Sequence, residues 1–329
     1  MDILKRMLTK SQRKRILPCI GLVKKKVKDG VDILQSARAW YDMFSKALST
    51  LEFMINERDP CVFNMADENG KIIASVFIHV DDGYLSCVND EIVTRFKTQL
   101  DKIFTHGITW KEGHFDEYLG MVMDFSTPGK CYITMKDYIE RIVDEWKVEK
   151  TKEYPHTREL FTIDETKEKL NKEDAKKFHR CVAQLLYLST HVRPDILVST
   201  IFLTSRVKEP TVEDRKKLIQ CLAYFKGTSS LGLCLRADKN GKLMLNCYSD
   251  ASFNVHPDAK SHAGIVIFLG AAATLFKSYK IKMVNKSVAD FELRHCDTEN
   301  MCADILTKPL QGQQFYKLRA ILLGYSDTN

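Results

Sequence analysis

Apolar and polar residues recur along this chain with two different periods, one typical of helices and one typical of strands. Between residues 36 and 51 apolar residues return every three or four positions, which places them on one face of a helix. In the next segment the turns Asn69-Gly70 and Asp82-Gly83 each separate two apolar runs, and such dipeptides are typical of β-hairpins. The pattern therefore predicts a helix followed by three short antiparallel strands between residues 61 and 88.

The same order repeats up to residue 146. Asn89 or Asp90 can cap a helix whose apolar residues, between Ile92 and Phe104, share one face. A second hairpin follows, with strands over residues 118–125 and 131–135, and then another helix. Strands, helix, strands, helix is the order of an α+β fold, in which a sheet carries helices on one face.

The second half of the chain has a different organisation. Residues 147–175 are rich in charged and poor in apolar residues, which predicts a linker. Apolar stretches broken by Pro194 and Pro210 predict a helical block over residues 178–222. Strand-like runs between residues 231 and 277 predict a second antiparallel sheet.

Composition is that of an ordinary globular protein. With 329 residues, 44% of them hydrophobic, the chain can form two domains. No apolar run reaches the roughly 18 residues that span a bilayer, and the first residues do not resemble a secretory signal. We therefore expect a cytoplasmic or nuclear protein with no membrane partner. The ten cysteines form no CxxC pair, so we expect reduced thiols, mostly buried, and no zinc site.

Charge is unevenly distributed. The net charge is +7, and basic residues crowd the first thirty positions, where only Asp2 and Asp29 oppose them. These basic residues are Lys5, Arg6, Lys10, Arg13, Lys14, Arg15, Lys24, Lys25, Lys26 and Lys28. Two interpretations stay open: a basic arm that is exposed to solvent, or an arm that binds along the phosphates of a nucleic acid.

Two adjacent acids, Asp81 and Asp82, end the apolar run that begins at Phe77. Phosphoryl transfer needs carboxylates that hold divalent cations, and a hairpin can project such acids from a rigid sheet. Asp-Asp-Gly is also a common turn sequence, and taken alone it favours a turn without a catalytic role.

Neighbouring motifs change that interpretation. In chain order they are Gln-Ser-Ala-Arg-Ala-Trp-Tyr at residues 35–41, Tyr-Leu-Gly at 118–120, His-Val-Arg-Pro-Asp-Ile at 191–196, Gly-Thr at 227–228, Tyr-Ser-Asp-Ala at 248–251 and Ala-Asp-Ile-Leu-Thr-Lys-Pro-Leu at 303–310. With these motifs the chain resembles copia-type retrotransposon Pol polyproteins, in the region of their reverse transcriptase and ribonuclease H, over about residues 30–318.

The resemblance implies a domain order. After a basic N-terminal arm (residues 1–30) it implies a reverse transcriptase palm remnant over residues 31–150, a ferredoxin-like sheet with helices on one face. A charged linker (151–177), a helical connection (178–230) and an incomplete ribonuclease H-like domain (231–320) follow.

The resemblance also implies roles for residues of the palm. His79-Val80-Asp81-Asp82 corresponds to the family's tyrosine-valine-aspartate-aspartate box, so Asp81 would bind catalytic magnesium (Mg2+) or manganese (Mn2+) and Asp82 would support the site. Asp2 is the candidate for the first metal-binding aspartate, which lies upstream in the family. Gln35 and Arg38 would line the groove for nucleotide and template. The implied partners are an RNA and DNA template-primer and deoxynucleotides.

In the ribonuclease H region, Asp250 and Asp304 match the first and last of the family's four metal-binding acids. The segment that carries the other two acids is missing between Ser287 and Phe291.

The palm departs from the family as well. Val31-Asp32-Ile33-Leu34 replaces tyrosine-glycine-leucine-lysine, and His79 replaces tyrosine. We therefore expect a truncated reverse transcriptase fragment, without the fingers, whose polymerase activity is weak or lost and whose ribonuclease H is inactive. The alternative is a non-enzymatic nucleic-acid-binding remnant. The sequence makes no prediction of oligomeric state.

Overall fold

The computed structural model describes residues 20–24, 33–79, 82–104, 108–164, 166–236, 245–256, 258–281 and 296–326, with side chains from Arg38 onward. Backbone contacts divide the chain into two units, residues 1–131 and 132–329. The chain passes from one unit to the other within strand β9, Lys130–Thr134.

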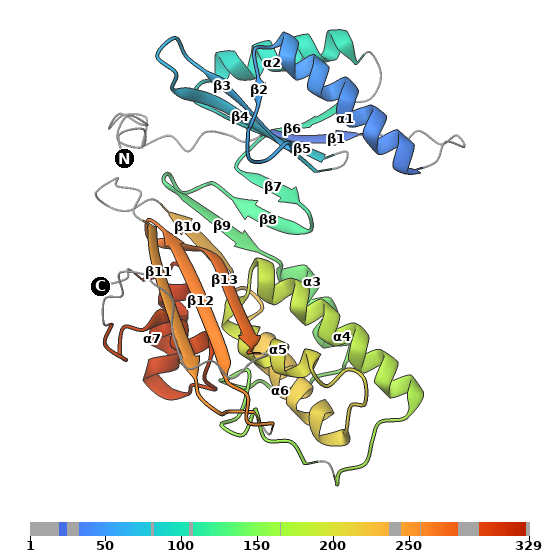
Figure 1. Cartoon of the computed structure of the whole chain (residues 1–329). Helices are drawn as coiled ribbons and strands as arrows, with labels where there is room; N and C mark the ends of the chain where they lie inside the picture. Colours follow the sequence, from blue (N-terminus) through green and yellow to red (C-terminus); the bar gives the residue numbers. More distant parts are fainter. Residues whose placement is uncertain are drawn as a thin grey trace. The chain divides into compact units, whose positions relative to one another are not determined.

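The first unit is built on a sheet of six strands that carries two helices on one face (Figure 1). The strands are β1 (Ile20–Lys24), β2 (Met54–Ile55), β3 (Val62–Ala66), β4 (Ile72–His79), β5 (Asp82–Cys87) and β6 (Ile108–Lys111), and the helices are α1 (Ile33–Thr50) and α2 (Asp90–Ile103). Their order across the sheet is β2-β3-β4-β5-β1-β6. Aromatic and aliphatic side chains of both helices and of β3 to β5 form one core between the two layers.

The connectivity of this unit is that of a ferredoxin-like fold. Along the chain β1, α1, β4, β5, α2 and β6 follow the order β-α-β-β-α-β, and in the sheet β1 lies between β5 and β6. Adjacent strands pair antiparallel. The predicted α+β fold with helices on one face of the sheet is therefore confirmed.

Three strands of this sheet escaped prediction: β1, β6 and the two-residue β2. β1 lies inside the stretch that was predicted to be a basic arm, yet it pairs with β5 on one side and with β6 on the other. β1 has five residues and β6 has four, so neither gives a long apolar run, and β1 is also followed by lysines. Pairing with strands distant in sequence, rather than a local pattern, forms both.

A hairpin of β7 (Phe115–Tyr118) and β8 (Met121–Asp124) replaces the single strand predicted over residues 118–125. Leu119 and Gly120 have φ angles of 53° and 74°, and this left-handed pair reverses the chain. The rings of Tyr118 and Phe125 lie 5.9 and 6.4 Å from that of Tyr84 in β5. Leu85 faces the helices, so its neighbour Tyr84 points to the opposite face of the sheet, which this hairpin partly covers.

The second unit combines a helical layer with a three-stranded sheet (Figure 1). Its helices are α3 (Lys136–Glu145), α4 (Lys172–His191), α5 (Leu197–Thr204), α6 (Val212–Thr228) and α7 (Gly312–Leu322), and its 3-10 helices are η3 (Pro194–Ile196) and η4 (Cys302–Leu306). Besides β9 its strands are β10 (Leu233–Arg236), β11 (Leu245–Ser252), β12 (His262–Leu269) and β13 (Ala272–Lys280). The predicted antiparallel sheet is present as β11-β12-β13.

The segment predicted as a charged linker, residues 151–177, packs on the second unit. His156, Leu160 and Phe161 are buried, and the ring of Phe161 lies 4.8 Å from that of His256 and 5.4 Å from that of His262. These three buried side chains lie among many charged residues. The composition of the segment is therefore polar, as in a linker, although the segment packs against the core.

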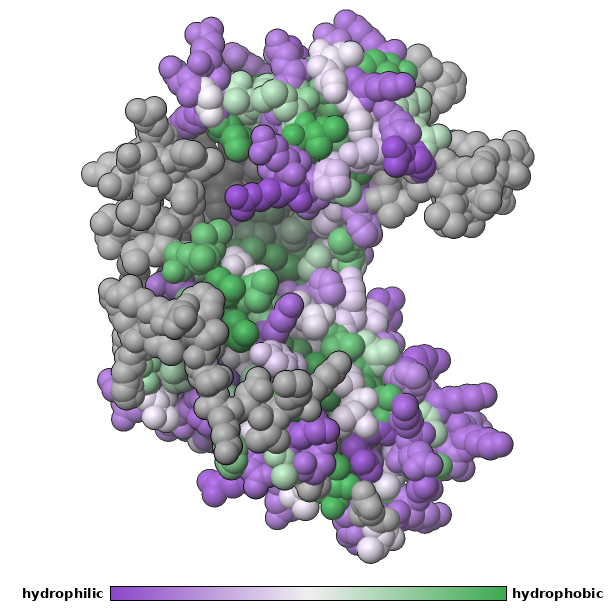
Figure 2. Space-filling model, in the orientation of Figure 1, coloured by the Kyte–Doolittle hydropathy of each residue, from purple (hydrophilic) through white to green (hydrophobic). Residues whose placement is uncertain are grey.

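The visible surface of the helical layer is polar, and most of the described thiols are buried. Hydrophilic side chains cover much of the visible face of the α4–α6 layer (Figure 2). Nine cysteines lie in the described ranges and all are free thiols, six of them buried. Burial raises the pKa of Cys181 to about 12, so this thiol stays protonated at neutral pH. No helix of the described part is long and apolar enough to cross a membrane.

Candidate active sites

The turn between β4 and β5 carries the acids predicted for polymerisation. His79, the last residue of β4, lies opposite Asp82, the first residue of β5, and Asp82 is partly buried. Val80 and Asp81 lie outside the described residues, as does Asp2. Of the three acids predicted for the palm, the structure therefore locates Asp82 alone.

Asp116 in β7 is an acid that sequence reasoning missed. It is 7% exposed, and its Oδ1 accepts a hydrogen bond from the backbone N–H of Glu117 at 2.8 Å. Its Oδ2 is buried without a hydrogen-bond partner. Burial raises the pKa of Asp116, and the charge of Asp82 raises it further, while Glu117 N–H and Lys111 act in the opposite direction. The signal in the sequence is weak, since one acid in a four-residue strand belongs to no motif.

Strand alternation explains how Asp116 comes near Asp82. Asp82 and Tyr84 are two residues apart on β5 and share a face, as do Asp116 and Tyr118 on β7. The contact between the rings of Tyr84 and Tyr118 brings these two faces together. Burial and then the charge of Asp82 raise the pKa of Tyr118, which agrees with this proximity.

The strand next to β5 contributes no acid. β1 runs antiparallel to β5 with Leu22 opposite Gly83, and its sequence, Ile-Gly-Leu-Val-Lys, contains no carboxylate. Gln35 belongs to α1, and its side chain lies outside the described part. Arg38 is exposed and forms an ion pair of 3.1 Å with Asp42 one turn later.

In the second unit the two predicted ribonuclease H acids do come together. Asp250 lies in β11 and Asp304 in η4. The Nζ of Lys308 lies 2.8 Å from Oδ1 of Asp304 and 3.3 Å from Oδ2 of Asp250, and the hydroxyl of Thr307 donates to the same Oδ2. A lysine therefore bridges the two carboxylates.

Burial shapes the charges of this acid pair. Asp304 is 2% exposed, and its Oδ2 has no hydrogen-bond partner. Burial raises the pKa of Asp304 and Asp250 adds to the rise, while Lys308 lowers it. Burial alone would lower the pKa of Lys308, but the two acids outweigh it and raise that pKa. The ammonium of Lys308 is therefore held in its charged form.

A glycine lets η4 approach the sheet. Gly264 in β12 lies opposite Asp250. A Cβ atom at Gly264 would lie 2.8 Å from both Leu306 Cβ and Thr307 Cγ2, which is closer than real contacts of this kind. The absent side chain thus allows η4 to set Asp304 beside Asp250.

Both acid pairs fall short of a complete metal centre. Within the part of the chain that the structure describes, no three His, Cys, Asp or Glu side chains are grouped to hold a metal ion. Magnesium needs only one or two protein carboxylates when water or substrate phosphates fill its other positions. The Oδ2 of Asp116 and the Oδ2 of Asp304 are each buried without a hydrogen-bond partner, and Lys308 already lies between Asp250 and Asp304.

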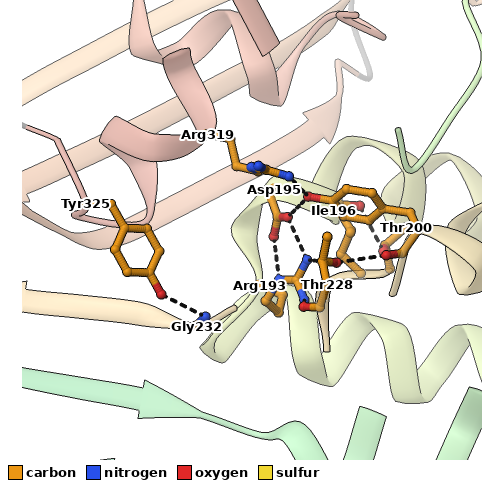
Figure 3. Close-up of polar contacts among 9 residues, drawn as sticks. Arg193, Asp195, Ile196, Thr200, Thr228, Gly232, Arg319 and Tyr325 are labelled. Atoms are coloured by element: carbon orange, nitrogen blue, oxygen red, sulfur yellow. Dashed lines mark hydrogen bonds and ion pairs between the residues drawn. The ribbon is translucent and has the colours of Figure 1, made fainter. Parts of the chain in front are cut away.

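The motif at residues 191–196 has a structural role (Figure 3). Arg193 and Asp195 are fully buried and pair through two hydrogen bonds of 2.9 and 2.8 Å. Arg193 also donates to Thr228 in α6, while Tyr224 donates to Asp195 and accepts from Arg319 in α7. Burial alone would raise the pKa of Asp195, but Arg193 outweighs it and lowers that pKa. This network joins η3, α6 and α7.

Comparison with known proteins agrees with the sequence motifs. A family model described as reverse transcriptase (RNA-dependent DNA polymerase) matches residues 23–160. A transposon Ty5-1 protein of Saccharomyces cerevisiae is 26% identical over 76% of this chain and 79% of its own length. The retrovirus-related Pol polyproteins from transposon TNT 1-94 of Nicotiana tabacum and from transposon RE1 of Arabidopsis thaliana are 25% and 27% identical over 78% and 79% of this chain.

The chain spans only 20% and 17% of the lengths of those two plant polyproteins. Among solved structures, a foamy viral protease-reverse transcriptase in complex with double-stranded DNA matches 62% of this chain and 32% of its own, with a TM-score of 0.38 and 13% identity. The family model and the Pol relatives together support a reverse transcriptase fragment similar to those of copia-type retrotransposon Pol polyproteins.

Proposed function

We propose that this chain is a reverse transcriptase remnant that binds RNA and DNA but carries out little or no templated synthesis and does not cleave RNA. The observation that carries the proposal is the composition of β1. This strand pairs with β5 beside Asp82, and its one charged residue is Lys24, not an acid.

Nucleotidyl transfer by two metal ions needs carboxylates that bind both ions at once, and most of its catalysis is positioning of charge. A strand without an acid beside Asp82 leaves that requirement to Asp81 and Asp2. If activity persists, Asp81 would bind Mg2+ or Mn2+, Asp82 would support the site, and Gln35 and Arg38 would line the groove for template-primer and deoxynucleotides. The bound metal would activate the primer hydroxyl and neutralise the leaving pyrophosphate.

The ribonuclease H-like region lacks room for its metal ions. A divalent cation would have to displace Lys308, whose charge the two acids stabilise at 2.8 and 3.3 Å. Two carboxylates neutralised by an internal ammonium offer little attraction to a further cation. The region is therefore proposed to be inactive and to serve as a folded support.

Nucleic-acid binding is proposed on charge. A net charge of +7 with a basic first segment attracts RNA and DNA through their phosphates, without sequence preference. Such a role suits a cytoplasmic or nuclear location. This non-enzymatic binding is the alternative that remains if no synthesis is found.

Primer extension with the full chain tests the proposal. On a primed RNA template with Mg2+ or Mn2+ we expect no extension above that of the Asp81→Asn variant, while the same template-primer is retained in a filter-binding assay. Magnesium-dependent extension that is lost in both Asp81→Asn and Asp2→Asn would overturn the proposal and make Asp2 the missing ligand.

A further inference from the structure

Residues 152–162 form a strap that lies on the second unit against two groups of buried histidines. The first group is His156 of the strap itself, and the second is the pair His256 and His262, on which Phe161 of the strap packs. We propose that the strap is an acid-sensitive contact, which detaches when these histidines take up protons while helices α4 and α6 stay folded. This contact goes beyond the proposed function, because its release requires neither synthesis nor nucleic-acid binding.

His156 holds the strap through both of its ring nitrogens. Nε2 lies 3.1 Å from the carbonyl oxygen of Leu310, which can only accept, so this nitrogen carries the proton. Nδ1 lies 2.8 Å from the hydroxyl of Ser199 in α5 and therefore accepts from it. His156 is 2% exposed, and a second proton would place a charge in this buried site without a counter-ion among the groups that set its pKa. Protonation is therefore favoured in a strap that has moved away and exposed the ring to water.

The histidine pair beneath the end of the strap opposes protonation for a similar reason. Nε2 of His256 and Nδ1 of His262 lie 3.0 Å apart and share one hydrogen bond, so a proton added between them would bring two N–H groups together. The charged groups that act on the pair are Lys280 of β13 and, in the loop before β12, Lys260 and Asp258. Both lysines pair with Asp258, at 2.7 and 3.1 Å, so its carboxylate is already neutralised and does not balance a charged imidazole ring.

Other contacts of the strap keep their charge between pH 7 and pH 5. The side chain of Gln220 in α6 donates to the carbonyl of Tyr154 at 2.7 Å. Lys217 of the same helix donates to the carbonyls of Leu160, at 2.9 Å, and of Thr162. Because the strap contains no helix or strand, it can open by itself at a lower cost in free energy than α4 or α6. Acid therefore acts first on the strap.

Hydrogen exchange of the full chain at pH 7 and pH 5, followed by mass spectrometry and corrected for the intrinsic effect of pH, tests the proposal. Burial lowers the pKa of His156 and of His262 from 6.5 to about 4. The open state should therefore become about 20-fold more populated at pH 5 for each of these two rings that opening exposes. The amides to follow are those of Lys152, which donates to Ala223 of α6, and of Leu160. Peptides of α4 and α6 should keep their protection.

Three variants separate the histidines from the other contacts. His156→Gln removes one titrating ring and should reduce the ratio of strap exchange at pH 5 to that at pH 7 by about 20-fold. Lys217→Met is the matched comparison, since it removes contacts that do not titrate in this range and should raise strap exchange equally at both pH values. His179→Gln, at an exposed position of α4, should change neither value.

Corrected strap exchange that is equal at pH 7 and pH 5 in the unvaried chain would overturn the proposal. An equal loss of protection in the strap, α4 and α6 would also overturn it, because the whole unit would then unfold together. So would an unchanged ratio in a folded His156→Gln variant. If that variant does not fold, the unvaried chain and Lys217→Met still decide, with a ratio near one in both as the contrary result.

Discussion

At the scale of single residues, Lys308 stabilises the second unit because it neutralises two acids at once. We expect Lys308→Met to lower the free energy of unfolding by about 1–2 kcal/mol. This is less than the roughly 3–5 kcal/mol for a fully buried pair, because about a third of Lys308 is exposed and solvent screens its charge. Urea unfolding at neutral pH measures the change.

The control for Lys308 is Lys317→Met, since Lys317 contacts a neutral partner, Asn300, and lies at the surface. The loss in Lys308→Met should shrink as pH falls, because the pKa of Asp304, already raised by burial, rises further without the ammonium and the carboxyl then takes up a proton. Equal losses in both variants would contradict the bridging role of Lys308.

Two buried histidines connect stability to pH. The hydroxyl of Ser278 donates to the carbonyl of Leu306, so Nε2–H of His262 donates to Ser278, and Nδ1 of His262 accepts from His256. No ring nitrogen of His262 can take another proton without losing a hydrogen bond. Burial lowers the pKa of His262, and likewise that of His156, to about 4.

This lowering makes the fold sensitive to acid. The unfolded chain binds a proton at each histidine near pH 6.5, but the folded chain does so only near pH 4, so stability falls as pH decreases from 6.5 towards 4. The loss is at most about 3 kcal/mol for each residue. Urea midpoints measured across this range should show a smaller pH slope for His262→Asn than for the unvaried chain. An unchanged slope would contradict the pKa of about 4.

At the scale of elements, the close packing of η4 against β12 depends on a glycine, which has no side chain, at position 264. Gly264→Ala should destabilise the chain by about 1–3 kcal/mol, because its Cβ would meet Leu306 and Thr307 at 2.8 Å and would overpack the contact. Gly227→Ala in α6 is the matched control, since its Cβ would meet Thr151 at an ordinary 3.5 Å and alanine favours a helix. Thermal or urea unfolding distinguishes the two variants. Equal stability of Gly264→Ala and Gly227→Ala would contradict the close contact between η4 and β12.

Elements with a strong local pattern were predictable from the sequence. Asn89 caps α2 through its side chain, which accepts from the backbone N–H of Ile92, and the strands around Asp82-Gly83 pair as the turn chemistry indicates. β1 was missed because its pattern is short and its stability comes from pairing on both sides. Asp116 was missed because burial by a neighbouring strand, and no motif, gives it significance. Lys308 lay inside a quoted motif, but its contact with Asp250 depends on the tertiary fold.

At the scale of the whole molecule, the basic first segment should set the salt dependence of nucleic-acid binding. Removal of residues 1–18 deletes six basic residues and leaves β1 in place, whereas removal up to residue 30 would also delete that strand. We expect the shorter deletion to reduce the slope of log affinity against log salt by up to about 5 for a duplex. Filter binding at several salt concentrations measures it.

Replacing the same six basic residues with glutamine is the control, and it should flatten the slope equally. Identical slopes for the full and the trimmed chain would show that the segment does not reach the phosphates. The attraction would then come from the rest of the chain, which carries a net charge of +2 without residues 1–18.

The central position of β1 has a consequence for assembly. Because β1 lies between β5 and β6, a chain deprived of it would present two open strand edges that face one another across a gap of a single strand. Such a gap is a template for any extended peptide, and the best-matched peptide is β1 of a second molecule. Cleavage just after Lys24 would therefore make the chain's own β1 exchangeable with that of a second molecule and would allow strand-swapped dimers to form.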